Sequence, residues 1–305
     1  MTITENRVSR RSMLKGAAAA GAGAMALAAC APDYYDGPGV IAVKVGKVPA
    51  DDPGSNAWTN ALPSKIALGP QDLVLPMKLT PLVSELRVST IYDDETIGFL
   101  LEWDDPNVND LTVRVDDFRD ACAVMLLPGA PDDGLRSMGS ATTAATLLHW
   151  KADWQRDVDQ GRQGLDAVYP NRSVDVYPIV HEVPAAEVDI SSYEDAGATE
   201  WLPGVDVGNP MSAASRTTPV EKAIANGFST TTTAATQNAN GRGERTETGW
   251  RVVITRPLAA TDEGELACSA GTTCSCAFAV WSGSDNDAGS RKQPSTIVHA
   301  LNLKA

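Results

Sequence analysis

Short segments with alternating hydrophobic and polar residues lie in two groups, one near each end of the chain. The alternation of side chains predicts β-strands at residues 41–48, 73–79, 86–92, 97–103, 111–115, 250–256, 276–281 and 296–303. Residues 121–127 are all apolar and predict a strand buried on both faces. Turn-forming residues separate these segments at β-sandwich spacing, and the polar stretch 93–96 predicts a hairpin. The pattern therefore predicts an all-β fold, an antiparallel β-sandwich.

The middle of the chain, residues 129–245, shows a different pattern. It carries long polar stretches, including residues 184–204 and the threonine-rich residues 230–236, and only short apolar pieces. Loops of this length in a compact domain are uncommon and are usually functional or disordered. We therefore expect the terminal strands to form one sandwich, with the long middle loops lying over it as a flap that encloses a ligand pocket.

The N-terminus has the features of an export signal. Arg10 and Arg11 precede a weakly apolar run of alanine and glycine, which is typical of a twin-arginine signal. This run is shorter and less apolar than a membrane-spanning helix. The segment Leu-Ala-Ala-Cys at residues 27–30 resembles a lipoprotein box, which predicts acylation of Cys30; ordinary cleavage after a small residue nearby is the alternative.

These features predict the domain boundaries and the location. Residues 1–30 form the signal with its lipoprotein box, residues 31–39 a tether, and residues 40–305 one folded domain. The protein is expected in the periplasm, anchored to a membrane through an N-terminal lipid. Because the twin-arginine route carries folded proteins, it favours a cofactor inserted before export.

The charge balance narrows the choice of partners. The chain contains 25 lysine and arginine residues against 39 aspartate and glutamate residues, which gives a formal net charge of −14. Such a surface repels phosphate backbones and anionic lipid heads, so the sequence argues against nucleic-acid binding and against a basic membrane-binding patch. A basic partner protein remains compatible with this charge.

Four cysteines follow Cys30, and an exported protein can use them in disulfides. Cys268 and Cys274 flank a five-residue loop and are candidates for one disulfide, whereas Cys276 lies in a predicted strand and could face Cys122 in another. A zinc site is a weak alternative, because no histidine lies near this cluster. The absence of a Cys-x-x-Cys-His motif excludes covalently attached c-type haem.

Motifs for independent catalysis are missing. No pair of histidines has the spacing of a zinc protease helix, and no Gly-x-Ser-x-Gly or Walker A motif occurs. The Gly-x-Gly at residues 241–243 lies in a predicted loop and lacks the strand–helix context of a dinucleotide site. We therefore expect no catalysis by this chain alone, although it could be a non-catalytic subunit of an enzyme complex.

Two segments carry residues suited to metal chemistry. Met138 lies on a glycine-bearing loop at residues 135–140, and Arg291 and Lys292 place two cations in an otherwise acidic protein. Together with residues 119–124, 149–152, 250–258 and 278–283, these segments resemble the haem b-binding gamma subunits of type II dimethyl-sulfoxide-reductase-family molybdoenzymes. That family includes ethylbenzene dehydrogenase, dimethylsulfide dehydrogenase, selenate reductase and chlorate reductase. The resemblance runs from about residue 41 to residue 303.

The resemblance implies a β-sandwich with one non-covalent haem b, held between a methionine and a lysine. Met138 and Lys292 would be the axial ligands, with the burial of a sandwich interior keeping the lysine uncharged. Arg291 would point outward or bind a haem propionate, and Trp281 would form part of the pocket wall. His149 is either a competing iron ligand, since imidazole is a common one, or a packing residue beside the pocket.

The implied function is electron transfer. The chain would relay single electrons between an iron–sulfur/molybdenum enzyme and an external partner, such as a soluble, basic cytochrome c. Its own export signal, its lipoprotein box and its acidic inserts depart from the family pattern, so a subunit of a complex and a solitary haem lipoprotein both remain open. The alternative from another class is a surface-anchored carbohydrate-binding β-sandwich without haem.

Overall fold

The computed structural model describes residues 33–72, 74–171, 203–213 and 215–304. The predicted signal, Cys30 and most of the acidic insert at residues 184–204 lie outside these ranges. The described residues form a mainly β structure, which confirms the predicted fold class. No helix among them is long and apolar enough to cross a membrane.

The strands belong to one 13-stranded sheet with the order β8-β7-β6-β5-β11-β13-β1-β3-β4-β10-β9, in which β12 pairs with β11 and β2 with β3. Neighbouring strands are antiparallel except at β1, which is parallel to both β13 and β3. The bounds are β1 Val40–Lys44, β2 Ser64–Ala67, β3 Glu85–Tyr92, β4 Thr96–Asp104, β5 Ala121–Pro128, β6 Ala145–Lys151, β7 Val220–Ala225, β8 Thr232–Thr233, β9 Asn240–Arg245, β10 Gly249–Pro257, β11 Cys274–Trp281, β12 Gln293–Pro294 and β13 His299–Lys304.

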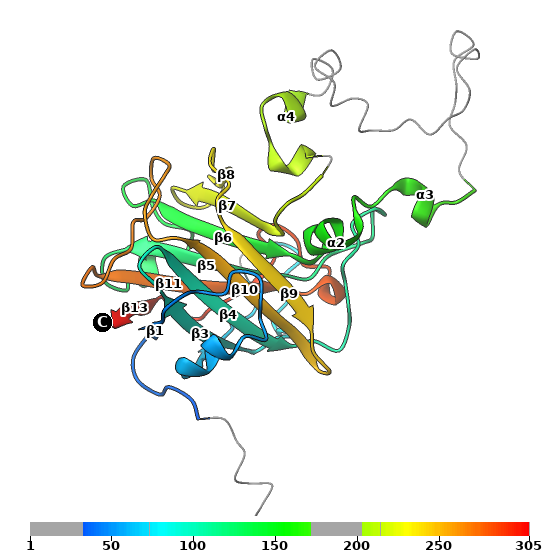
Figure 1. Ribbon diagram of the computed structural model, residues 1–305. Helices are drawn as coiled ribbons and strands as arrows, with labels where there is room; N and C mark the ends of the chain where they lie inside the picture. Colours follow the sequence, from blue (N-terminus) through cyan, green and yellow to red (C-terminus); the bar gives the residue numbers. More distant parts are fainter. Residues whose placement is uncertain (1–32, 73, 172–202, 214, 305) are drawn as a thin grey trace, which may run out of the picture. The chain divides into compact units, whose positions relative to one another are not determined.

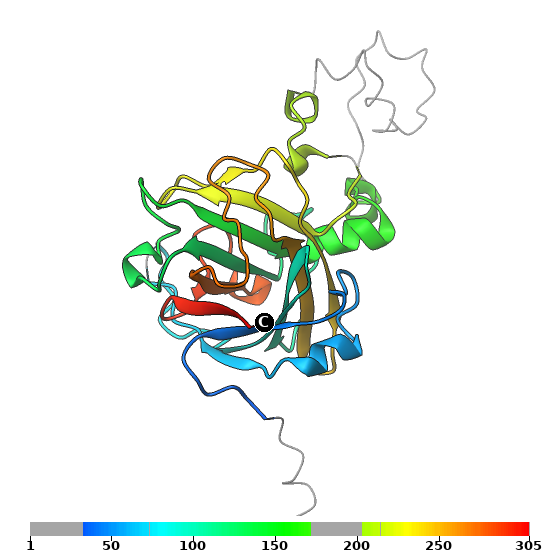
Figure 2. The same cartoon turned by 60° about the vertical axis from the view of Figure 1, so that its left-hand side comes forward.

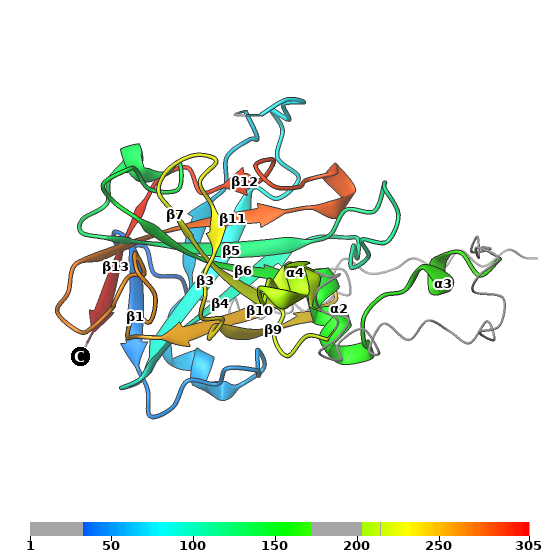
Figure 3. The same ribbon diagram turned by 90° about the horizontal axis from the view of Figure 1, so that it is seen from above.

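Helices are few and short. α2 (Ala152–Gln160) packs at the ends of β6 and β9 (Figure 3). The remaining helices are η2 (Asn56–Asn60), η3 (Asp133–Leu135), α3 (Leu165–Val168), α4 (Pro203–Asp206), η7 (Pro210–Ser212) and η8 (Gly283–Asp285).

The sheet curves around a common interior (Figures 1 and 2), so that one half, β7-β6-β5-β11, packs against the other, β3-β4-β10-β9. Three tryptophans meet in this core: the ring centroids of Trp150 and Trp250 are 5.1 Å apart, and Trp103 lies 6.3 and 6.5 Å from them. Burial of such large apolar side chains from both halves is the main force that holds the two halves together.

Several predicted strands are confirmed, among them β3, β4, β5 and β10. The predicted hairpin joins β3 to β4, and the Asp93 carboxylate closes its turn by accepting hydrogen bonds from the backbone of Glu95 and Thr96 at 2.9 and 2.7 Å. The apolar run of β5 is buried on both faces, as predicted, because its even-numbered residues face the core and its odd-numbered residues face a second layer of loops.

Two predicted strands are wrong. Residues 74–79 form bends around Pro76, which has no backbone N–H to donate to a neighbouring strand. Leu75 and Leu79 are both exposed, so the side chains do not alternate between buried and exposed positions. Residues 111–115 run into a turn in which the Arg114 amide donates to the Asp117 carboxylate, and Val115 is fully exposed. In both segments the hydrophobic residues do not reach the core.

The expectation that the middle of the chain is only a flap is also wrong. It supplies β6, β7 and β9, which are full members of the sheet. Leu148, Trp150 and Val220 from this region are buried in the main core. Strand β9 has no hydrophobic pattern because glycines, Gly241 and Gly243, occupy its core-facing positions, where they lie against Val220 and Trp150.

Candidate functional site

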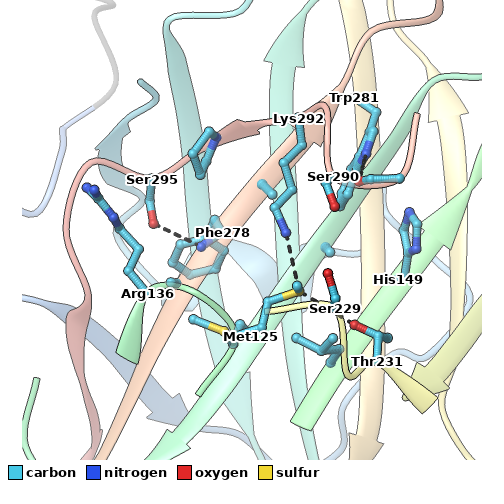
Figure 4. Close-up of a pocket in the computed structure, with 17 residues that line it drawn as sticks. Met125, Arg136, His149, Ser229, Thr231, Phe278, Trp281, Ser290, Lys292 and Ser295 are labelled. Atoms are coloured by element: carbon cyan, nitrogen blue, oxygen red, sulfur yellow. Dashed lines mark hydrogen bonds between the residues drawn. The ribbon is translucent and has the colours of Figure 1, made fainter. Parts of the chain in front are cut away.

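A cavity of about 340 Å³ lies on the outer face of the half-sheet formed by β6, β5 and β11 (Figure 4). Since successive side chains of a strand point to opposite faces, the odd-numbered residues of these strands form its floor. Ala279 of β11 lies opposite Ala123 of β5, which in turn lies opposite His149 of β6. In the next row Ala277 is opposite Met125. The small alanine side chains leave a broad, apolar floor.

This position differs from the expected sandwich interior. The residues between the two halves of the sheet, such as Val124 and Val280, belong to the main core, whereas the floor residues belong to separate buried clusters on the opposite face. The pocket is enclosed by loops, as predicted, but these loops close over the outside of the sheet.

Met138 and Lys292 come from the two loops that cover the cavity, and the structure brings them together. The Lys292 Nζ atom lies 3.6 Å from the Met138 Sδ atom, although 154 residues separate them in sequence. Both side chains line the cavity, and Figure 4 shows Lys292 pointing into it. The pair of residues implied by the family resemblance therefore converges at one point above the floor.

The Met138 loop is a tightly constrained turn. Asp132 caps η3 by accepting a hydrogen bond from the Gly134 amide at 2.8 Å. Met138 then adopts a φ of +68°, which is uncommon for a bulky residue and costs on the order of 1 kcal/mol. Gly139 follows with a φ of +80°, and a Cβ there would lie 2.4 Å from the Thr143 carbonyl oxygen. Only glycine fits this turn, which presents Met138 to the cavity.

The position of the Lys292 loop is fixed by hydrogen bonds of the next residue, Gln293. Gln293 begins β12, its carbonyl oxygen Oε1 accepts from the Val83 amide at 2.7 Å, and its Nε2 donates to the Asp287 carboxylate at 3.0 Å. Trp281 Nε1 donates to the Gly289 carbonyl oxygen at 3.0 Å. These buried bonds fix the backbone on both sides of Lys292.

The two loops are also joined to each other. The Asp133 carboxylate accepts a hydrogen bond from the Val298 amide at 2.8 Å, and the Arg136 guanidinium donates to the Thr296 carbonyl oxygen. The relative position of Met138 and Lys292 is therefore set by contacts outside the cavity, before any ligand enters.

The electrostatic surroundings favour an uncharged Lys292 amine. In the part of the chain that the structure describes, no carboxylate forms an ion pair with Lys292, and burial lowers the pKa of its amine. The contact of its Nζ atom with the Trp281 ring, 5.5 Å from the ring centre, acts in the opposite direction, because a ring face attracts the charged form. A lysine binds a metal only as the free amine, and this environment reduces the free energy needed to remove its proton.

His149 stacks on Trp281, with ring centroids 4.5 Å apart and an angle of 26° between the rings. Its Nε2 atom is shielded from solvent and has no hydrogen-bond partner among the described residues. Burial, followed by the positive charges of Lys151 and Arg119, holds the pKa of His149 well below its usual range. The imidazole is therefore neutral, and it forms the cavity wall with Trp281.

Two smaller cavities adjoin the first. One of about 240 Å³ shares His149, Trp281 and Gly289 with it, and one of about 160 Å³ shares Met138 and Lys292, among others. The largest cavity therefore borders both smaller ones, which share no lining residue with each other.

Arg291 is not brought into this space. It lines none of the three cavities, and its guanidinium carbon lies 5.7 Å from the centre of the Phe118 ring. Arg136 does line two of them, and the sequence analysis did not single it out. The feature of the sequence that could have identified Arg136 is its position two residues before Met138.

Of the two candidate cysteine pairs, the structure brings only one together. The Sγ atoms of Cys268 and Cys274 lie 3.8 Å apart, so this pair is close. Cys122 lies opposite Val280, whereas Cys276 lies opposite Leu126, a separation of four positions or about 13 Å along the strands. The structure therefore does not bring Cys122 and Cys276 together.

The donor set fits a haem iron. No group of three or more histidine, cysteine, aspartate or glutamate side chains suited to a metal ion occurs in the described residues. The cavity contains two thioethers, Met125 in the floor and Met138 in a covering loop, and only Met138 lies beside the amine of Lys292, which has no ion-pair partner among the described residues. These residues would hold a haem b through Met138 and Lys292.

The comparisons with known proteins identify a family. A comparison with curated proteins finds no match. Two solved structures of a family 9 carbohydrate-binding module from Caldicellulosiruptor kristjanssonii, with glucose and with cellotriose, are 11% and 12% identical to this chain. They cover 87% of this chain, and the matched parts are 96% and 94% of the module, but their TM-score of 0.36 carries no argument. The model of the ethylbenzene dehydrogenase family matches residues 55–293, so the chain belongs to this family.

Proposed function

We propose that the protein is a haem b electron-transfer subunit of a molybdoenzyme complex. The observation that carries this proposal is the convergence of Met138 and Lys292 in one apolar cavity, at 3.6 Å. The family match supports the association with a molybdenum-containing catalytic subunit and an iron–sulfur subunit. The haem, when bound, supplies reversible one-electron chemistry.

The residues of the chain set the properties of that site. Met138 offers a soft, neutral donor, which favours the reduced metal and raises the reduction potential. Lys292 offers a neutral amine, which its burial favours. If Met138 and Lys292 both held the haem iron, the protein would leave no site on it for a substrate, and the haem would pass electrons rather than perform catalysis.

The surroundings of the cavity suit this role. His149 and Trp281 form a stacked wall at one end of it, and the alanines of the floor present no polar groups to the face of a planar ligand. A site that is apolar and held by two joined loops changes little between two redox states.

The remaining features complete the proposal. Export by the twin-arginine route and acylation of Cys30 would hold the protein at the outer side of a membrane. The net charge of −14 would attract and orient a basic soluble cytochrome c as the external partner.

An absorption spectrum of the purified, exported chain from a haem-sufficient host tests the proposal. A Soret band and a b-type pyridine haemochrome are expected. Met138→Ala should shift that spectrum and release haem faster, whereas Arg291→Ala, beside the site but outside the cavities, should leave both unchanged. A folded but colourless wild-type protein would reject the proposal and favour a binding module without haem.

A further inference from the structure

We propose that Arg136 binds a haem propionate, so that the carboxylate edge of the porphyrin faces the smallest of the three cavities and the opposite edge faces His149. This inference rests on the proposed function, because it concerns how the haem is oriented. It assigns Arg136 as a binding and positioning residue.

Arg136 lies where the two relevant cavities meet. It lines both the largest cavity, which holds Met138 and Lys292, and the adjoining cavity of about 160 Å³. Figure 4 shows Arg136 and His149 on opposite sides of Lys292. A ligand centred near Lys292 therefore has Arg136 at one edge and His149 at the other.

The other cations near the cavity already have partners. Arg119 forms an ion pair with Asp153 at 2.7 Å, and Lys151 forms a short one with Glu221. Arg291 lies over the Phe118 ring, outside the cavities.

Arg136, by contrast, has donors to spare. Its Nη1 donates to the Thr296 carbonyl oxygen, and no ion pair joins it to a carboxylate within the described ranges. A guanidinium carries five N–H donors, so one backbone bond leaves most of them available to a carboxylate.

The two ends of the space differ in polarity in the way that a haem requires. The end at Arg136 carries hydroxyl groups from Ser137, Ser290 and Thr296. The opposite end is lined by the His149–Trp281 stack above Ala123 and Ala279, and the cation beyond that stack, Arg119, is already paired. An amphipathic ligand places its charged edge at the end that offers unpaired donors, because burial of a carboxylate without partners is costly.

One acid opposes this assignment. Asp72 lines the smallest cavity and is exposed, so solvent screens its repulsion. The bond from the Arg136 guanidinium to Thr296 ties Arg136 to the loop that carries Lys292. Arg136 and both axial ligands are therefore positioned by the same pair of loops.

The test compares haem b with its dimethyl ester, which lacks both carboxylate charges. The full chain is prepared without haem and titrated with each compound, following the Soret band. Wild type should bind haem b at least about tenfold more tightly than the ester, since a charge-assisted hydrogen bond contributes about 1.5–3 kcal/mol. Arg136→Gln should reduce this preference to about twofold or less, with an unchanged Soret maximum because the axial ligands are intact.

Arg291→Gln is the matched control and should keep the wild-type preference. Arg136→Lys retains the charge without the planar fork and should retain part of the preference. Thermal unfolding of the haem-free variants checks that each one folds.

The outcomes separate the two proposals. If Arg136→Gln discriminates like wild type, or if Arg291→Gln loses the preference in its place, the role of Arg136 is overturned while haem binding stands. If wild type binds neither compound, both the proposed function and this inference are overturned.

Discussion

Replacement of Lys292 by leucine distinguishes two roles of this residue, as a ligand of the haem iron or as a cation that stabilises the fold. The substitution keeps the apolar part of the side chain and removes the amine, so ligation is lost while most of the packing remains. The contacts of the amine in the structure give the expected change in the free energy of unfolding of the haem-free chain.

Two terms oppose each other in the haem-free protein. Loss of the contact with the Trp281 ring, at 5.5 Å, costs about 0.5–1 kcal/mol. Removal of a half-buried amine whose one hydrogen bond is to the weak acceptor Met138 Sδ, 3.6 Å away, recovers about 1–3 kcal/mol. The free energy of unfolding of haem-free Lys292→Leu should therefore equal that of wild type or exceed it by up to about 2 kcal/mol.

Haem binding should change in the other direction. Loss of a residue that merely supports a metal ligand lowers metal affinity by about 10–100-fold, so loss of the ligand itself should lower haem affinity at least tenfold. Urea unfolding of the haem-free chain and haem transfer to apomyoglobin measure the two quantities, with Arg291→Leu as the control. A variant that is clearly destabilised without haem, yet keeps the wild-type spectrum and haem affinity, would refute the reasoning.

Two further predictions concern the scaffold. Cys268 and Cys274, with Sγ atoms 3.8 Å apart, should form a disulfide in the exported protein, so that reduction makes two additional thiols reactive to maleimide. The double serine variant should have an unfolding free energy about 2 kcal/mol lower than wild type. Equal maleimide labelling before and after reduction would contradict the disulfide. Burial raises the pKa of Asp120 to about 6, above its unfolded value of about 3.9, so its contribution to stability is present at low pH and declines as the pH rises from about 4 to about 6. The stability of wild type relative to Asp120→Asn should fall by up to about 3 kcal/mol over this window in urea titrations, and a constant difference would show that the carboxyl does not titrate there.

The haem-site predictions show where sequence reasoning succeeded and where it stopped. Met138 and Lys292 were identified through a family resemblance, and the structure places them together. For Arg291 the sequence left two alternatives, an outward orientation or a bond to a propionate, and in the structure its guanidinium lies over the Phe118 ring, outside the cavities. Which neighbour enters a cavity depends on the loop conformation, and that is set by distant contacts such as the one between Arg136 and Thr296.

Strand β9 illustrates the same limit for the fold. Its sequence, Asn-Gly-Arg-Gly-Glu-Arg, has no hydrophobic alternation and was interpreted as a loop. It is a strand because its backbone pairs with β10, and Gly243 is required because a Cβ there would lie 2.1 Å from the Trp150 ring. The need for glycine arises from a tryptophan more than 90 residues away in the chain.

Local sequence patterns were sufficient to predict the all-β class, the β3–β4 hairpin and the doubly buried β5, because alternation and turn chemistry act between residues close in the chain. Three properties of the pocket follow from the folded chain alone: it lies on the outside of one half-sheet, alanines from adjacent strands form part of its floor, and Arg136 lines it. Those properties depend on strand order and on contacts between loops far apart in sequence, and a local pattern of residues carries no information about either.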